Sequence, residues 1–185
     1  MSSSETSIRY LNLSRLYRRE RFKYHYKSLI AGFMIALGSY ANMKVGGIPG
    51  SILFSLGLLT VIHFRLPLFT GMVAFLENYS GLERVRSLFV VLALNFMVAA
   101  TVGCFAFLRG IESKINIGVK LMKTPPEFLF DAILCGICVA IAAKSRNQLM
   151  TMLVVALFVL CGGEHCIADM FYVGEHGRRT DVEQD

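Results

Sequence analysis

An apolar run that stops about halfway across a bilayer limits most strongly what this chain can fold into. Residues 149–160 are almost uniformly apolar, but Gly162-Gly163-Glu164-His165 follows them before apolar sequence resumes. At about 1.5 Å per residue the run reaches roughly 18 Å, against about 30 Å for a hydrocarbon core. An interrupted helix beside ionisable side chains persists only where the freed backbone faces protein or a water-filled cavity. We therefore predict that His165 is the functional centre of a membrane protein.

The composition also favours a polytopic membrane protein. Of the 185 residues, 55% are hydrophobic and only 17% are charged, which is less charge than a soluble domain of this size carries. The net charge of +6 could indicate nucleic-acid binding. We reject that class, because the basic residues lie beside apolar spans, where Lys and Arg set topology.

The apolar blocks predict an all-α fold of five transmembrane segments, two of which are broken helices. The predicted segments cover residues 29–43, 51–76, 88–108, 128–143 and the interrupted stretch from 149. In the second segment, His63, Arg65 and Pro67 separate two apolar runs. Breaks at corresponding places in two halves predict an aquaporin-like inverted repeat, with a substrate site at the midplane between them. Helix N-termini that point inward favour an anion there.

The charged ends of the chain suggest its domain organisation. Residues 1–27 form a basic N-terminal arm, residues 28–173 a membrane domain, and residues 174–185 a charged tail. The positive-inside rule places the arm in the cytoplasm, although the loop of residues 109–126 on the opposite side is also basic. We expect an integral protein of the plasma (inner) membrane.

The two broken segments resemble those of the formate/nitrite transporter family. Residues 163–170, Gly-Glu-His-Cys-Ile-Ala-Asp-Met, are similar to the family's G-[FY]-E-H-[SC]-[VI]-A-N-M element, with His165 as its central histidine. Residues 52–59 followed by Leu68-Phe-Thr-Gly71 are similar to its second span and L-F-T-[GS] loop. The resemblance covers about residues 28–173. It implies a homo-pentamer in the lipid bilayer, each subunit with a pore for small monovalent anions such as formate, nitrite or hydrosulfide.

The resemblance also implies particular pore residues. Thr70 and His165 would face each other between apolar constrictions, and Lys120 would stand where the family has a loop lysine that draws anions to the pore mouth. For Lys120, a solvated loop charge is an equal alternative. The residues implied as constrictions are Phe54, Leu58, Val139 and Phe158.

His165 can be charged or neutral near physiological pH. Our hypothesis is that it attracts the anion and shares or donates a proton, because a bare anion would cost several kcal/mol or more to move through apolar gates. The alternative is a buried histidine that bonds only to backbone. For Glu164 we favour a structural role, satisfying loop backbone at this depth. The Thr70 hydroxyl could donate to the anion or cap the second half-helix.

Four departures from the family pattern bear on function. Asp169 stands where the family usually has Asn, and an ionised carboxylate there would repel anions unless it is protonated or paired. Gly136 and Gly163 replace an Asn and an aromatic residue, at or near the pore. Five spans are visible where the family has six. The second hypothesis is therefore a truncated, non-conducting membrane subunit that retains the fold for assembly, and a third is a pore for neutral solutes or water.

Cysteines near the second break could suggest a metal or redox site. Cys135 and Cys138 form a C-x-x-C, and Cys161 and Cys166 flank the Glu-His pair. The C-x-x-C lies inside an apolar span, where cysteine commonly serves as a small residue at helix contacts. We predict no metal and no cofactor. We also predict no enzymatic activity, because nothing resembles a nucleophile and base in a water-accessible pocket.

Overall fold

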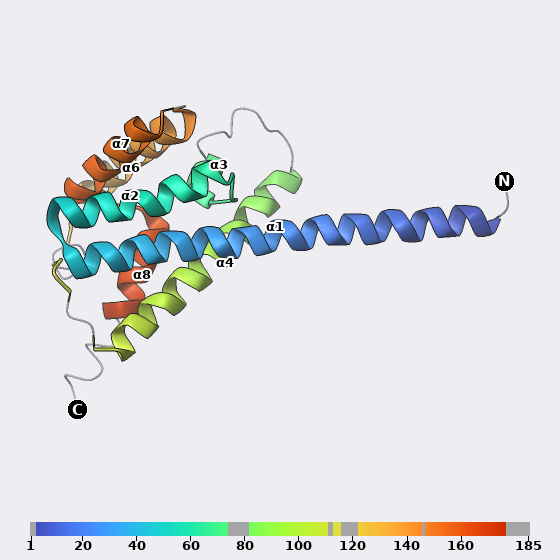
Figure 1. Cartoon of the computed structure of the whole chain (residues 1–185), viewed down its shortest axis with the longest axis horizontal. Coiled ribbons are helices and arrows are strands. Elements are labelled where there is room, and N and C mark those ends of the chain that lie inside the picture. Colours follow the sequence, from blue (N-terminus) through green and yellow to red (C-terminus); the bar gives the residue numbers. More distant parts are fainter. Residues whose placement is uncertain (1–2, 74–81, 111–112, 116–121, 146, 177–185) are drawn as a thin grey trace.

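The structure is a computed structural model, and it describes residues 3–73, 82–110, 113–115, 122–145 and 147–176. Every regular element in these ranges is a helix, which confirms the predicted all-α fold (Figure 1). The helices are α1 (Ser3–Val45), α2 (Gly47–His63), α3 (Phe69–Val73), α4 (Leu82–Leu108), α6 (Pro125–Lys144), α7 (Gln148–Leu160) and α8 (Cys166–His176).

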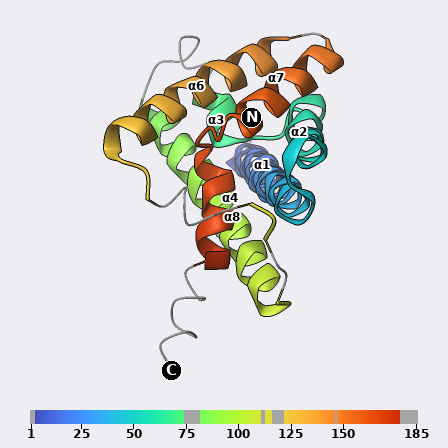
Figure 2. The ribbon, with the colours of Figure 1, turned by 90° about the vertical axis from the view of Figure 1, so that its left-hand side faces the viewer.

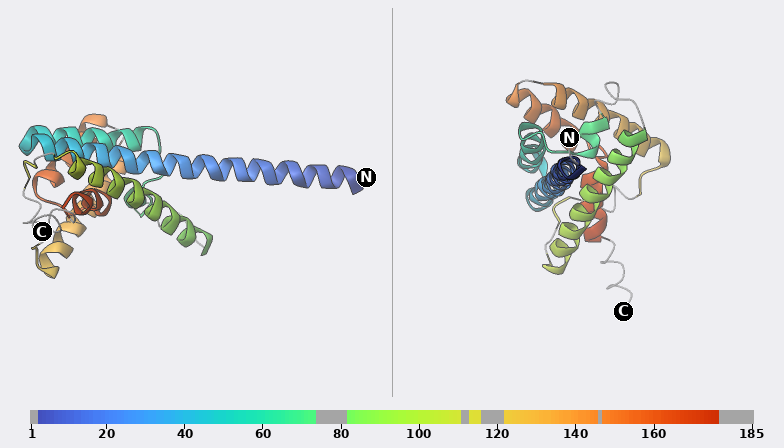
Figure 3. Two further views of the ribbon diagram at one scale, coloured as in Figure 1. Left: turned by 90° about the horizontal axis from the view of Figure 1, so that it is seen from below. Right: turned by 90° about the vertical axis from the view of Figure 1, so that its right-hand side faces the viewer.

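Helix α1 is continuous from the basic arm into the first predicted span. Its N-terminal part projects beyond the other helices (Figure 3). The predicted boundary at residue 27 therefore corresponds to no break in the helix. The predicted segments leave residues 44–50 between the first two spans, but only Gly46 separates the helices, because α1 ends at Val45 and α2 begins at Gly47. Gly46 and Gly47 make this tight turn possible, with φ of 67° and 56°, values that glycine adopts without a steric penalty.

Both predicted helix breaks are present. Helix α2 ends at His63 and the chain resumes as α3 at Phe69, with Arg65 in the left-handed region at φ 49°. Helix α7 ends at Leu160 and α8 begins at Cys166, with Gly162 at φ 75°. In each case two helical pieces flank a short irregular segment, as the interrupted apolar runs predicted.

Contacts between helices follow the pattern that an inverted repeat predicts. Helix α1 packs on α2 as α6 packs on α7, and α2 packs on α7 across the centre. The short second pieces reach into the opposite half: α3 packs on α6, and α8 packs on α1. Helix α4 packs on α1 and α8, and in Figure 2 α4 and α8 lie below the α6–α7 hairpin. The two breaks therefore lie in the seam between the halves.

Glycines allow several of these helices to approach closely, as expected for packing in lipid. A Cβ added to Gly103 of α4 would lie 2.1 Å from the backbone oxygen of Phe171 in α8. A Cβ on Gly57 of α2 would lie 2.5 Å from the oxygen of Met34 in α1. Neither approach leaves room for a side chain. These glycines therefore set how closely α8 packs on α4 and α2 packs on α1.

Large apolar side chains point outward from the bundle. Among the residues that the structure describes, three helices are long and apolar enough to cross a membrane, Phe22–Val45, Val85–Leu108 and Pro125–Lys144, while Gly47–His63 and Gln148–Leu160 are apolar but shorter. Apolar faces of this extent normally lie against lipid or another apolar surface. Exposed examples on α4, α6 and α7 are Phe89, Phe105, Phe130, Ile137, Leu153 and Leu157.

Substitution of Gly103 by Ala tests the close packing of α4 on α8. The new methyl group would collide with backbone at Phe171, so we expect a loss of about 1–3 kcal/mol in stability and a lower thermal denaturation midpoint in detergent. Gly136→Ala is the matched control, because a Cβ on Gly136 of α6 meets no atom within 4 Å. Equal midpoints for the two variants would contradict this packing.

Candidate functional site

His165 connects the two helix breaks. It lies in the segment before α8 with 1% of its surface exposed, and its Nε2 is 3.1 Å from Oγ1 of Thr70 in α3. On the other side of the ring, the backbone N–H of Ala168 donates to Nδ1 over 3.3 Å. Because Nδ1 accepts, the proton of the neutral ring sits on Nε2, which donates to the Thr70 hydroxyl. Thr70 therefore bonds to the histidine from the first turn of α3.

Two aromatic rings surround the imidazole. Phe158 of α7 stacks on it with ring centroids 6.2 Å apart and planes 15° apart. Phe54 of α2 meets it edge-on at 6.3 Å and meets Phe158 edge-on at 6.0 Å. With rings in place of water and Nδ1 already accepting, these contacts suit the uncharged form of His165.

Two cavities approach His165 and its two aromatic neighbours from opposite ends of the bundle. The smaller one, about 190 Å³, is lined by His165, Phe54 and Phe158, and also by residues of the loop after α4 such as Ile115. The larger one, about 910 Å³, is lined by Leu58 and Val139 and also by Tyr24, in the N-terminal half of α1. Phe54 and Leu58 are one helical turn apart, so the cavities meet α2 on either side of a single turn.

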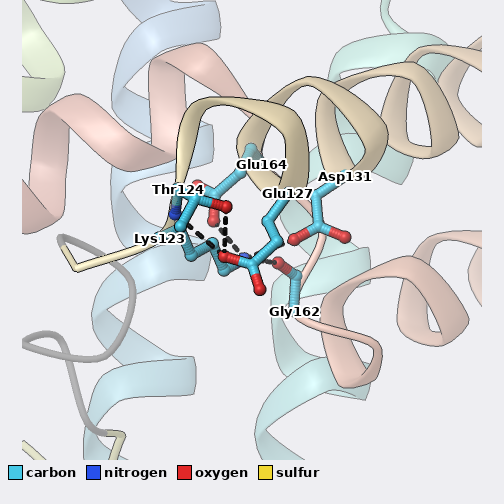
Figure 4. Close-up of polar contacts among 6 residues, drawn as sticks. All are labelled: Lys123, Thr124, Glu127, Asp131, Gly162 and Glu164. Atoms are coloured by element: carbon cyan, nitrogen blue, oxygen red, sulfur yellow. Dashed lines mark hydrogen bonds and ion pairs between the residues drawn. The ribbon is translucent and has the colours of Figure 1, made fainter.

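Lys123 holds the second break together (Figure 4). Its Nζ donates to the backbone oxygen of Gly162 over 2.8 Å and pairs with Glu164 at 2.5 Å and with Asp131 of α6 at 2.6 Å. The Glu164 side chain is only 4% exposed, and those of Lys123 and Asp131 are 17% and 18% exposed. Both the freed carbonyl and the buried carboxylate therefore receive a charged partner, which loop backbone at this depth requires.

The carboxylates around Lys123 control its titration. Burial alone would lower the pKa of its ammonium group, but the hydrogen bonds and charges of Asp131 and Glu164 outweigh burial and raise the pKa above its ordinary 10.5. Lys123 is therefore charged at every physiological pH.

Asn95 holds the first break in the same way. This fully buried residue of α4 accepts from the backbone N–H of Phe69 over 3.0 Å, and its Nδ2 donates to the oxygen of Ser28 over 2.7 Å. The oxygen of Pro67 is 3.4 Å from the same Nδ2. One amide therefore joins the start of α3 to α1 and α4.

The structure brings most of the predicted site residues together. His165, Asp169, Phe54 and Phe158 line the smaller cavity, Leu58 and Val139 line the larger one, and Thr70 and Glu164 bond to His165 and Lys123. Lys120 lies outside the described residues. Gly136, which we expected at or near the pore, is exposed on α6 and lines neither cavity.

Sequence reasoning missed Lys123 and Asn95. Lys123 is one of three lysines in the predicted loop of residues 109–126, and nothing in the local pattern distinguished it from the other two. Asn95 did carry a signal, as a lone amide in a long apolar predicted span, where polar residues are costly and usually bonded.

The cysteines considered as metal ligands are all free thiols. Within the described ranges, no three His, Cys, Asp or Glu side chains are placed so that they could hold a metal ion.

Comparison with known proteins identifies the fold. The sequence model for the formate/nitrite transporters matches residues 13–175. The chain belongs to the formate/nitrite transporter family. The resemblance carried by residues 52–71 and 163–170 is thereby confirmed, and this family member is an integral membrane protein.

A solved structure shares this fold. A pentameric formate channel with formate bound matches with a TM-score of 0.68 and 23% identity, over 88% of this chain and 78% of that channel. No curated protein matches the chain.

Removal of the Lys123 charge tests its role in this family member. Lys123→Met leaves two carboxylates and the Gly162 carbonyl without their ammonium partner, and we expect a loss of about 3 kcal/mol or more, seen as a lower thermal midpoint in detergent. Lys114→Met is the control, because Lys114 is an exposed lysine of the same loop. Equal midpoints for the two variants would exclude a stabilising role for Lys123.

The raised pKa of Lys123 also predicts a pH dependence. A lysine with a raised native pKa contributes its full stability below the unfolded value of 10.5, and that contribution is lost as the pH rises through the native pKa. The midpoint difference between wild type and Lys123→Met should therefore be constant at neutral pH and shrink above about pH 10.5. A difference that already shrinks near neutral pH would contradict the ion pair.

Proposed function

We propose that this family member is a transmembrane channel or transporter for small monovalent anions, with formate, nitrite and hydrosulfide as the candidate substrates. The observation that carries the proposal is the bond between Thr70 and His165. It joins the two helix breaks where cavities approach from opposite ends of the bundle. A polar pair at the meeting point of two cavities is what a selective crossing of an apolar barrier requires.

The polar pair supplies donors where the gates supply none. The Thr70 hydroxyl accepts from Nε2 of His165 and can donate its own proton to an anion. Phe54 and Phe158 on one side, and Leu58 and Val139 on the other, offer an anion no hydrogen bond. Because a bare anion would cost several kcal/mol or more in such surroundings, we propose that a proton crosses the gates with it, held between the anion and His165.

The assembly that we propose is a homo-pentamer in which each subunit has its own pore. Two features support it: the likeness to a pentameric formate channel and the exposed apolar faces of α4, α6 and α7. We also propose that the protein lies in the plasma membrane. The basic N-terminal arm supports an orientation with the N-terminus in the cytoplasm.

Uptake into proteoliposomes tests the role of His165. In His165→Phe and Thr70→Val, formate uptake should fall at least about tenfold, a change that corresponds to only about 1.4 kcal/mol in the barrier. His63→Asn is the matched control, because His63 is an exposed histidine at the end of α2. The role of His165 fails if His165→Phe transports formate like wild type.

The same assay separates the remaining functions. Folded wild-type protein that passes none of the three anions would favour the non-conducting subunit, and flux of neutral solutes alone would favour a neutral pore. Subunit counting in the same preparation decides whether assembly is pentameric.

A further inference from the structure

Asp169 shares the smaller cavity with His165. It lies in the first turn of α8, where its backbone N–H donates to the His165 oxygen over 2.9 Å. Its Oδ2 is buried, and both side chains line the 190 Å³ cavity with Asn42 and Tyr172. An anion that reaches His165 through this cavity must therefore pass a carboxyl group.

The charges around this cavity are unfavourable to an anion as long as every carboxyl group is ionised. None of the described residues that line it is Lys or Arg. The nearby ammonium group is that of Lys123, and Glu164 and Asp131 already pair with it. With Asp169 ionised, this region holds one ammonium group and three carboxylates, those of Asp131, Glu164 and Asp169, beside an imidazole whose contacts suit its neutral form. A further anion would meet net repulsion.

Of the three carboxyl groups, Asp169 is the one that can accept a proton without disturbing the second break. Protonation of Glu164 or Asp131 would weaken the ion pairs that hold Lys123 and, through it, the Gly162 carbonyl. Asp169 makes neither of those pairs with Lys123, and it faces the cavity. A protonated carboxyl group changes from an acceptor only into a group that can donate, so the same side chain could bind the anion.

We propose that Asp169 is a proton-binding site that controls occupancy of the smaller cavity, so that an anion enters together with one proton, which Asp169 takes up. The proton converts the carboxylate to a carboxylic acid, and its O–H donates to the anion; no other bond forms or breaks. When the anion leaves, the proton leaves with it or returns to water. This inference rests on the proposed anion transport and names the residue that couples it to pH.

Other titratable groups near Asp169 do not supply the same switch. On its own segment these are His165, Cys166 and Tyr172, and Tyr172 accepts from Asn42 of α1 over 3.2 Å. Helix α7 contributes the apolar Phe158 and Val159 to the cavity. Helix α4 meets α8 at Gly103, whose neighbour is the free cysteine Cys104. Beyond the Gly162 turn lie Lys123, Glu164 and Asp131, which pair with one another.

Formate uptake by Asp169→Asn in proteoliposomes tests the proposal. Between about pH 5 and about pH 8, wild-type uptake, corrected for protein-free liposomes, should fall with rising pH, approaching about tenfold per unit above the titration of Asp169. In Asp169→Asn, which keeps a donor and carries no charge, uptake at the alkaline end should exceed that of wild type and fall less steeply with pH, because only the proton shared with His165 is still required. Glu127→Gln is the matched control and should keep the wild-type slope, because Glu127 is an exposed carboxylate that caps α6. An Asp169→Asn variant with the wild-type slope would overturn the proposal.

An infrared measurement tests the same proton without any transport. Adding formate to the lipid-embedded assembly at neutral pH should increase the band of protonated carboxyl groups in wild type and Glu127→Gln but not in Asp169→Asn. An unchanged carboxyl spectrum in wild type, or a gain that survives in Asp169→Asn, would overturn the proposal. If the band appears but no protein takes up formate, the proton site stands and the proposed transport function fails.

Discussion

The structure depends on giving hydrogen-bond partners to backbone that two helix breaks release in apolar surroundings. Asn95 accepts from the Phe69 N–H and donates to the oxygen of Ser28, and Lys123 donates to the oxygen of Gly162. Without such partners each freed group would cost several kcal/mol in hydrocarbon. Each break is thus held by one side chain from outside its own broken helix.

The side chains that hold the two breaks, Asn95 and Lys123, differ in charge. The first break rests on a neutral amide, whereas the second rests on an ammonium group that needs carboxylates around it. Adjacent residues of the second break serve different partners: Glu164 bonds to Lys123, and His165 bonds to Thr70. The ion pair therefore fixes the backbone that orients the imidazole, while the imidazole itself bonds to Thr70 of α3 and to the Ala168 N–H and lies against the aromatic rings. Anchoring and chemistry are divided between neighbouring side chains.

The sequence was sufficient to predict the breaks but not their supports. Gly162-Gly163 and Pro67 interrupt apolar runs, and both interruptions are visible to hydropathy and to turn chemistry alike. The side chains that support the breaks are far away in sequence from the groups they bond to. Asn95 and Ser28 are an example, and no local pattern connects them. Lys123 could not be separated from its loop neighbours, because only folding shows which lysine reaches Glu164. The continuity of α1 past residue 27 escaped prediction for a related reason: helices do not end where polarity changes.

The cavity beside His165 is a product of the two halves together. Phe54 and Asn42 come from α2 and α1, whereas Phe158 and Tyr172 come from α7 and α8. The bond from Asn42 to Tyr172 spans the seam at 3.2 Å, and the close approach of Gly103 to Phe171 fixes α8 against α4. The cavity walls are therefore held by contacts that neither half could make alone. Because a charge in such a cavity meets fixed side chains in place of mobile water, a single carboxyl group such as Asp169 has more influence on an entering ion than the net charge of the whole chain.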